Sequence, residues 1–151
     1  MKQRDRVTMT DGEVESFLAR GRKLQLATIG ADGMPHLVTM YYAVLGGQIS
    51  FWTYRSSQKA LNLIRDPRVS VLVEAGEAYF DLRGVQVQGT ARLIEDPAAV
   101  LEIGRAVAGA MAGTPGQQTE EYVAQAARKR VGFAVEPARV ISWDHARLLA
   151  G

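Results

Sequence analysis

Short apolar segments separated by turn-forming residues recur along most of the chain, a pattern typical of antiparallel strands joined by hairpins. In the first half these segments are LQLATI, HLVTMYYAVL and QISFWT, over residues 24–29, 36–45 and 48–53. Asp32-Gly33 and Gly46-Gly47 separate them, and such residue pairs are hairpin turn signals. The pattern therefore predicts three consecutive antiparallel strands over residues 24–53.

The same pattern continues in the second half of the chain. We expect a strand in VSVLVE (69–74), a strand pair or one bent strand over residues 79–94, and strands in VGFAVEP and ARVISW near the C-terminus. Gly84 and Gly89 lie inside the long segment, and a glycine within a strand marks a bulge or a close backbone approach.

Three further segments have helical signals. Thr10 and Glu13 form a capping-box pattern at the start of a helix over residues 11–20. Asp96 is a good N-cap and Pro97 a good first residue for a helix over residues 96–110. A loop rich in Gly and Pro is expected over residues 112–118, followed by a helix over residues 120–129.

Six or seven antiparallel strands with hairpin connections favour a mainly β fold. We expect a small barrel, closed or partly closed, with helices at its periphery. Closure is favourable because it removes exposed strand edges. The chain contains no repeat, low-complexity tract or clear linker, so we expect one domain over residues 1–151.

The composition excludes several classes of function. The chain has 18 Lys and Arg against 16 Asp and Glu, a net charge of +2 that does not favour nucleic acid as a partner. Without cysteine it has no thiolate nucleophile and no cysteine-based zinc site. No apolar run resembles a signal peptide or reaches membrane-spanning length, so we expect a cytoplasmic protein. An enzyme with so few reactive side chains would depend on a bound cofactor.

A short helix is predicted within TYRSSQKALNLIRDPR, residues 53–68. Ala60, Leu61 and Ile64 fall on one face of it at helical spacing, and Asp66-Pro67 ends it. The start of this helix is unusual, because Lys59 places a cation where the helix dipole is already positive.

A bound anion would make this arrangement favourable. Within seven residues the segment gathers three hydroxyls and two cations, from Thr53, Arg55, Ser56, Ser57 and Lys59. Together with the free backbone amides of a helix start, such donors bind phosphate. The alternative is that Ser57 is an ordinary N-cap and Lys59 a solvated surface residue.

The chain resembles the split β-barrel flavin and deazaflavin oxidoreductases, the superfamily of pyridoxamine 5′-phosphate oxidase, and most resembles the branch that binds coenzyme F420. The resemblance runs from LATIGADGMPHLVTMYYAV through ISFWTYRSSQKALNLIRDPRVSVLVE and LRGVQVQGTARLIEDP to ISWDH. It implies a six- to seven-stranded antiparallel split β-barrel of the FMN-binding, Greek-key type. In this superfamily a Thr at a strand end, a Ser and a Lys bind the cofactor phosphate, and Thr53, Ser57 and Lys59 match them.

The resemblance also implies where the rest of the cofactor lies. Its tricyclic ring would lie against the strand after the D-G-x-P turn, next to Val38, Thr39, Met40 and Tyr41, with Val38 also a core residue. The family is usually a homodimer with two cofactor sites at the subunit interface. Trp143 resembles residues that approach this interface or the partner's cofactor, and its alternative role is that of a core residue in the last strand.

Two departures from pyridoxamine phosphate oxidases argue against that reaction. Gln58 stands where those enzymes usually have an Arg, and WDHAR (143–147) does not reproduce their C-terminal Arg-x-His motif. The patterns S-x-K-x-x-N-L and R-D-P-R-V, present here over residues 57–69, are common in the F420 branch and also occur in FMN-binding relatives.

The expected function is hydride transfer from reduced F420 to an electron-poor small organic substrate. Tyr41, Tyr42 or solvent would supply the proton. The polyglutamate tail of F420 favours a basic groove, for which the candidates are Arg55, Arg65, Arg68 and Arg83. Two alternatives stay open, namely an FMN-dependent oxidoreductase on the same fold and a non-catalytic protein that binds F420 or a flavin.

Overall fold

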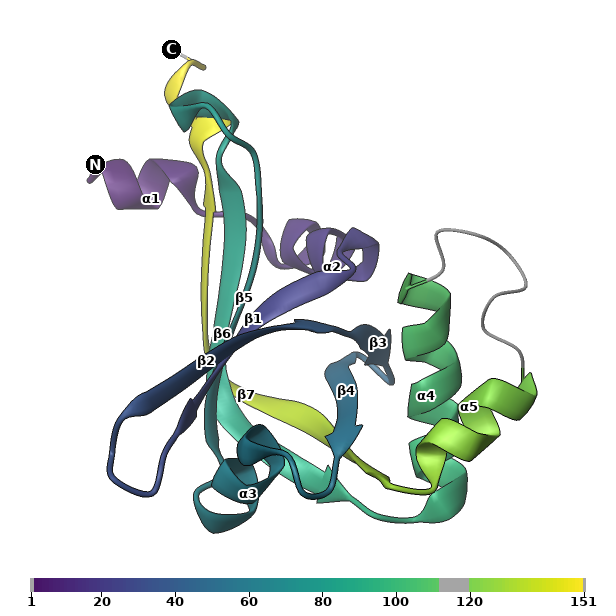
Figure 1. Ribbon diagram of the computed structural model, residues 1–151. Helices are drawn as coiled ribbons and strands as arrows, with labels where there is room; N and C mark the ends of the chain where they lie inside the picture. Colours follow the sequence, from purple (N-terminus) through teal and green to yellow (C-terminus); the bar gives the residue numbers. More distant parts are fainter. Residues whose placement is uncertain (1, 112–119, 151) are drawn as a thin grey trace.

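The computed structural model describes residues 2–111 and 120–150, and its centre is one seven-stranded antiparallel sheet with helices around it (Figure 1). The strands are β1 (Lys23–Ile29), β2 (Pro35–Tyr41), β3 (Ala43–Leu45), β4 (Gln48–Tyr54), β5 (Arg68–Ala75), β6 (Arg83–Ile94) and β7 (Arg130–Asp144). The α-helices are α1 (Gln3–Val7), α2 (Asp11–Arg20), α3 (Gln58–Arg65), α4 (Pro97–Met111) and α5 (Glu120–Ala127), and two 3-10 helices are η1 (Tyr79–Asp81) and η2 (His145–Leu148). The predicted mainly β, antiparallel split barrel with peripheral helices is confirmed.

The sheet closes on itself through β2 and β3. The strand order is β2-β1-β5-β6-β7-β4-β3, so the two edge strands are also consecutive in sequence, with only Tyr42 between them. β2 pairs with β1 and β3 pairs with the start of β4. One bent segment therefore joins both edges of the sheet and leaves a split where β2 and the rest of β4 diverge.

Tyr42 corrects the prediction of one uninterrupted strand over residues 36–45. Its side chain is 1% exposed and its phenol donates a hydrogen bond of 2.6 Å to the carbonyl of Leu18 at the end of α2. Burial raises the pKa of Tyr42 to about 12. A buried phenol needs such a partner. The hydrogen bond to α2 fixes Tyr42 at the point where the chain stops pairing with β1 and begins to pair with β4.

Two long strands also differ from the expected pattern. Residues 79–94 form η1 followed by the single strand β6, and the two segments near the C-terminus are one continuous strand, β7. Both glycines of β6 lie at close approaches, as predicted. A Cβ on Gly84 would lie 2.3 Å from the ring of Trp143, and one on Gly89, at the register shift between β6 and β7, would lie 2.0 Å from the carbonyl oxygen of Glu136.

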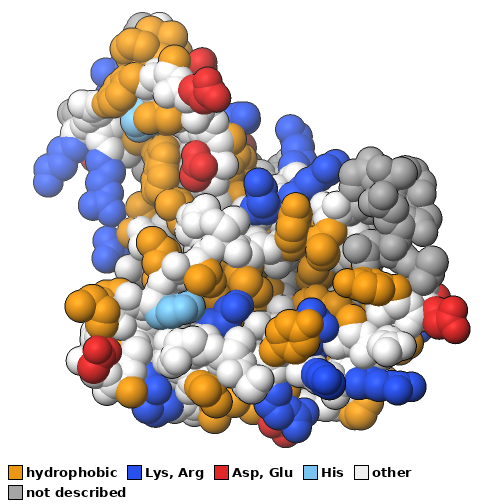
Figure 2. All heavy atoms as spheres, viewed as in Figure 1, with side chains coloured by type: hydrophobic (Ala, Val, Ile, Leu, Met, Phe, Trp, Pro, Cys, Tyr) orange, Lys and Arg blue, Asp and Glu red, His pale blue; other side chains and the backbone are white. Residues whose placement is uncertain are grey.

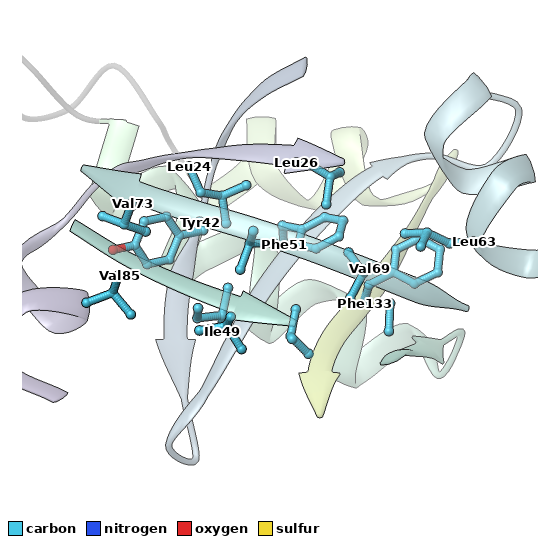
Figure 3. Packing of buried hydrophobic residues seen from close by; sticks show 14 of the residues in the cluster. Leu24, Leu26, Tyr42, Ile49, Phe51, Leu63, Val69, Val73, Val85 and Phe133 are labelled. Atoms are coloured by element: carbon cyan, nitrogen blue, oxygen red, sulfur yellow. The ribbon is translucent and has the colours of Figure 1, made fainter. Parts of the chain in front are cut away.

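The interior of the barrel is filled by aliphatic and aromatic side chains from the sheet and from α3 (Figure 3). The rings of Phe51 on β4 and Phe133 on β7 stack with centroids 5.6 Å apart. Leu24 and Leu26 of β1 reach into the same cluster and are almost fully buried. Burying this apolar surface is the main term that stabilises the fold.

The local signals for turns and caps are confirmed. Thr10 and Glu13 form the capping box of α2, and the carboxylate of Asp96 accepts from the amide of Ala99 at the start of α4. Gly46 and Gly47 both have positive φ, 57° and 77°, which the hairpin between β3 and β4 requires. The loop expected over residues 112–118 lies outside the described residues. Within the described residues no helix has the length and apolar character needed to cross a membrane.

Candidate functional site

A pocket of about 300 Å³ lies at the split between β2 and β4. Residues 39–41 of β2 and residues 52–54 of β4 line its two sides. The rest of the lining comes from Lys59 on α3, from Val107, Ala108 and Met111 on α4, and from Tyr122, Ala126 and Arg130 at the junction of α5 and β7. Its volume is at the lower end of the range for small-molecule pockets, about 300–1,000 Å³.

The edge of β2 that faces the split is free to bind a ligand. β2 is the terminal strand of the sheet and pairs with β1 alone among the described strands. Alternate residues of an edge strand direct unpaired N–H and C=O groups outward. The pocket therefore offers backbone donors and acceptors from β2 opposite the side chains of β4.

Thr53 and Ser57 join the end of β4 to the start of α3. Their hydroxyl oxygens lie 3.0 Å apart, and the oxygen of Ser57 also accepts from the amide of Ala60 at 3.2 Å as the N-cap of α3. Two hydroxyls carry two protons, and their mutual hydrogen bond uses one of them. One hydroxyl proton therefore remains for an acceptor from outside, beside the amides of the first helical turn.

Lys59 lies in the first turn of α3 and lines the same pocket as Thr53. Its side chain is half-buried, and this burial lowers the pKa of its ammonium group from the usual 10.5. Among the described residues no carboxylate lies within salt-bridge distance of it. A partly desolvated cation without a partner, next to free hydroxyl and amide protons, is suited to bind an anion.

Asn62 fixes α3 against the sheet, and the sequence pattern did not identify it. Its side chain is fully buried, donates to the hydroxyl of Thr28 on β1 at 3.1 Å and accepts from the amide of Gln58 at 2.7 Å. The face predicted to be buried was partly wrong, because Leu61 and Ile64 are half exposed. The buried hydrogen bonds of Asn62 rotate the helix so that Ala60 and Leu63, instead of those two residues, meet the core.

The other predicted site residues divide into two groups. Thr39, Met40 and Tyr41 line the pocket with Thr53 and Lys59, so the structure brings the expected ring-binding and phosphate-binding segments together.

The remaining predicted residues do not line this pocket within the described chain. Val38 packs against the core, and Arg55 and Ser56 are exposed in the turn before α3. Trp143 lies near the end of β7 with its ring over Gly84. Tyr42, expected as a possible proton donor, is buried under α2.

Three of the four arginines expected in a basic groove make contacts elsewhere and do not line the pocket at the split. Arg65 donates to the carbonyl of Ile29, Arg68 pairs with Asp66, and Arg83 lies 5.7 Å from the ring of Phe17 near α2. Arg65 and Arg68 lie at the end of α3 and the start of β5, whereas Arg83 lies near α2, so the three side chains are not gathered beside the pocket.

Arg130 is the cation of the pocket that sequence reasoning missed. Its guanidinium lies 4.0 Å from the centroid of the Tyr54 ring and 5.0 Å from that of Trp52. It also donates to the carbonyl of Ala126, which anchors it at the end of α5. The pairing of β4 with β7 places this arginine opposite Tyr54, and no local motif around residue 130 indicates it.

Size alone does not identify the site, because a larger hollow of about 570 Å³ lies between α2 and the ends of β5 and β6. Its charges are mixed, and its carboxylate Glu13 is already paired with Arg147. No group of three or more His, Cys, Asp or Glu among the described residues could hold a metal ion. The pocket at the split combines two cations that have no carboxylate partner among the described residues with aromatic walls and the hydroxyl of Thr53.

Comparison with known proteins identifies the family of the chain. The family described as pyridoxamine 5′-phosphate oxidase matches residues 10–144. A pyridoxine/pyridoxamine 5′-phosphate oxidase of Kineococcus radiotolerans is 36% identical over 78 residues, which make up 52% of this chain and 34% of that protein. The match thus spans about a third of that relative's length.

Two solved structures show how far the likeness extends. A conserved hypothetical protein of Mycobacterium tuberculosis is 43% identical and superposes with a TM-score of 0.90, over 98% of this chain and 92% of the other. A structure described as an F420 reductase is 26% identical with a TM-score of 0.61, over 83% of this chain and 94% of the other. From the family match over residues 10–144 and the split-barrel topology, we conclude that the chain belongs to the pyridoxamine 5′-phosphate oxidase family.

Proposed function

We propose that the protein is an F420-dependent oxidoreductase that reduces an electron-poor small organic substrate. The observation that carries the proposal is the single pocket that joins Thr53 and Lys59 to residues 39–41 of β2. Bound F420 would supply a hydride from its deazaflavin ring. The similarity to an F420 reductase at 26% identity supports this choice of cofactor within the family.

The residues of the pocket fit a phosphorylated tricyclic cofactor. The free hydroxyl proton of the Thr53–Ser57 pair, the first amides of α3 and the ammonium group of Lys59 form a donor set for phosphate. The free edge of β2 would hold the polar edge of the ring, and Trp52 on β4 adds an aromatic wall. These groups would bind and orient the cofactor and exclude water from it.

Of the two tyrosines expected as proton donors, Tyr41 lines the pocket and Tyr42 does not, so Tyr41 would deliver a proton to the substrate. Solvent is the alternative proton source, since the pocket is open on one side. Gln58 stands where pyridoxamine phosphate oxidases have an Arg. Its side-chain amide donates to the side chain of Asn62 in the next turn of α3. This supports a reaction other than pyridoxamine phosphate oxidation.

The cofactor site is proposed to be completed by a second copy of the chain in a homodimer. The pocket is at the small end for a ligand of this size, and the outward face of β2 carries Leu37 with 66% of its side chain exposed. Trp143, which lies away from the pocket of its own chain, would then approach the partner's cofactor.

An FMN-dependent oxidoreductase is the second candidate, favoured by the family match itself. A side-by-side fluorescence titration of apo-protein with F420 and FMN separates the two candidates. We expect tighter binding of F420, followed by turnover of reduced F420 with an electron-poor acceptor. Tighter binding of FMN would assign the protein to the second candidate, and tight F420 binding without turnover on any acceptor would identify a non-catalytic binding protein.

A further inference from the structure

Four large side chains line the pocket at the split and yet remain exposed, although each lies on a different element. They are Tyr41 of β2, Tyr54 of β4, Met111 of α4 and Tyr122 of α5, and we call them the apolar rim. Each is between 38% and 55% exposed. Hydrophobic side chains, with Lys and Arg side chains below them, are visible in Figure 2 where Figure 1 shows β4, α4 and α5. Exposed apolar groups that gather at a pocket mark a binding surface, because covering them is favourable.

Trp52 forms a wall of the same pocket, and α4 has a glycine where its ring packs. A Cβ on Gly104 would lie 2.4 Å from the ring of Trp52, so any larger residue there would displace the ring. Val107 and Ala108 of the same helix also line the pocket and are almost fully buried. The α4 side of the pocket therefore offers an apolar surface of fixed shape, distinct from the hydroxyl and ammonium donors that β4 and α3 contribute.

The charges of the pocket disfavour a positively charged substrate. Lys59 and Arg130 line it, whereas no Asp or Glu does so among the described residues. Aromatic rings attract cations by about 0.5–2 kcal/mol, but the guanidinium of Arg130 already lies over the rings of Tyr54 and Trp52. Two like charges about 6 Å apart repel each other by about 3 kcal/mol at an effective dielectric constant of about 20, which exceeds that attraction.

We propose that the apolar rim, Trp52 and the α4 side of the pocket bind the substrate, and that they select a flat, apolar ring compound without a positive charge. The inference rests on the proposed function and narrows its substrate to this class. A flat ring would cover the exposed side chains of the rim, and each Å² of apolar surface buried contributes about 25 cal/mol. Sugars are disfavoured because their hydroxyls would lose hydration against an apolar surface, and amines because no carboxylate among the described lining residues would pair with them.

Quinoline and N-methylquinolinium test the charge preference, because they share a ring system and differ in charge at neutral pH. Each is titrated into protein saturated with oxidised F420. Binding is followed through the indole N–H signals of Trp52 and Trp143, the two tryptophans of the chain, with Trp52→Phe to assign them. We expect quinoline to shift the Trp52 signal and to bind at least about tenfold more tightly than N-methylquinolinium, because of the repulsion between like charges. Equal or tighter binding of N-methylquinolinium, or a Trp52 signal that quinoline leaves unchanged, would overturn the proposal.

Two matched pairs of variants test the surface itself. Gly104→Ala should displace Trp52 and weaken quinoline binding by about fivefold or more, whereas Gly109→Ala on the same helix, where a Cβ meets nothing within 4 Å, should stay within about twofold of the wild-type protein. Met111→Ser on the rim should weaken it by about three- to tenfold. Its control is Leu61→Ser on α3, a similarly exposed residue that does not line the pocket. Equal quinoline affinities of Met111→Ser and Leu61→Ser would overturn the proposal, even if Gly104→Ala fails to fold.

The failure of the inference and the failure of the proposed function are distinguishable. If F420 binds and quinoline does not, the inference alone fails. If F420 does not bind the wild-type protein, the proposed function fails, and the same titrations on the apo-protein decide the surface: quinoline shifts at Trp52 that weaken in Met111→Ser would support it, and their absence would overturn it. Dimer formation that is lost in Met111→Ser and kept in Leu61→Ser would assign the rim to a contact between two copies and would also overturn the proposal.

Discussion

At the residue scale, the anion site depends on what pairs with the partly desolvated positive charge of Lys59. Its burial beside Thr53 lowers its pKa, because a half-buried ammonium group loses hydration. A phosphate that accepts from Lys59 would restore that lost interaction. The free hydroxyl proton of the Thr53–Ser57 pair would then complete the same anion site.

Replacing Lys59 by Ala should weaken the binding of both F420 and FMN, since both end their ribityl chain in a phosphate. We expect a loss of about 1.5–3 kcal/mol, the range for a hydrogen bond to a charged group. The measurement is a fluorescence titration with each cofactor, with Lys2→Ala as the control for loss of one positive charge. Wild-type affinity of Lys59→Ala for both cofactors would show that the phosphate binds elsewhere.

The lowered pKa of Glu13 predicts how folding stability changes at acidic pH. Hydrogen bonds from Arg147 and from the amide of Thr10 lower its pKa from 4.5 to about 2. A carboxylate with a lowered pKa contributes stability above its unfolded value of 4.5, and this contribution is lost as the pH falls toward 2. Because Glu13 is exposed, the effect should be small and should diminish with salt.

Thermal unfolding measured between pH 7 and pH 2 tests this contribution. As the pH falls from 4.5 toward about 2, the melting temperature of Glu13→Gln should decrease less than that of the wild-type protein. Glu15→Gln, an exposed residue of the same helix, is the control and should follow the wild-type profile. Superimposable profiles for all three proteins would contradict the role given to the Glu13–Arg147 pair.

At the scale of elements, α3 is the part that orients the anion site, and Asn62 holds it. The buried amide links α3 to β1 through Thr28 and braces Gln58 on the preceding turn. Any displacement of this helix would move Lys59 and the Ser57 cap together. The position of the phosphate donors therefore depends on a contact between α3 and β1.

Removing this contact with Asn62→Ala should cost about 1–3 kcal/mol of folding stability, because Thr28 is left without its buried partner. Cofactor affinity should fall as well, although Asn62 does not line the pocket. Chemical denaturation and the cofactor titration measure the two effects. Leu61→Ala, on the half-exposed side of α3, is the control and should change stability by no more than about 0.5 kcal/mol. An affinity unchanged in Asn62→Ala would contradict the positioning role.

The sequence predicts correctly those features that are formed by residues close together in the chain. The hairpin glycines, the capping box and the Thr53–Ser57–Lys59 set are each made by residues close together in the chain, and so they could be predicted. The buried face of α3 could not be, because the partner of Asn62 lies on β1, and apolar periodicity treats a buried amide as a surface residue. Arg130 was missed for the same reason, since only the pairing of β4 with β7 brings it to the pocket.

At the scale of the whole molecule, the barrel leaves apolar surface that a second copy would cover. Met34, just before β2, and Leu37 within it are 68% and 66% exposed. In β7, residues 136–140 are exposed, and among the described strands this part of β7 pairs with β6 alone. Large apolar side chains and open strand edges are features of an interaction surface.

We therefore expect a homodimer at micromolar concentration, with an interface of about 1,200–2,000 Å² as in stable complexes. Sedimentation equilibrium measures its dissociation constant directly. Leu37→Asp would place a charge on the outward face of β2 and should shift the equilibrium toward monomer, whereas Leu61→Asp on α3 is the control at a similarly exposed leucine. A wild-type protein that stays monomeric at micromolar concentration would contradict this arrangement.

A crystal structure of the protein in complex with F420 would test the proposed cofactor site most directly. We expect the phosphate within hydrogen-bond distance of Lys59 and of the Thr53–Ser57 hydroxyls, with the deazaflavin ring along residues 39–41 of β2. A complex in which the phosphate lies away from the start of α3, or the ring away from the split between β2 and β4, would contradict it.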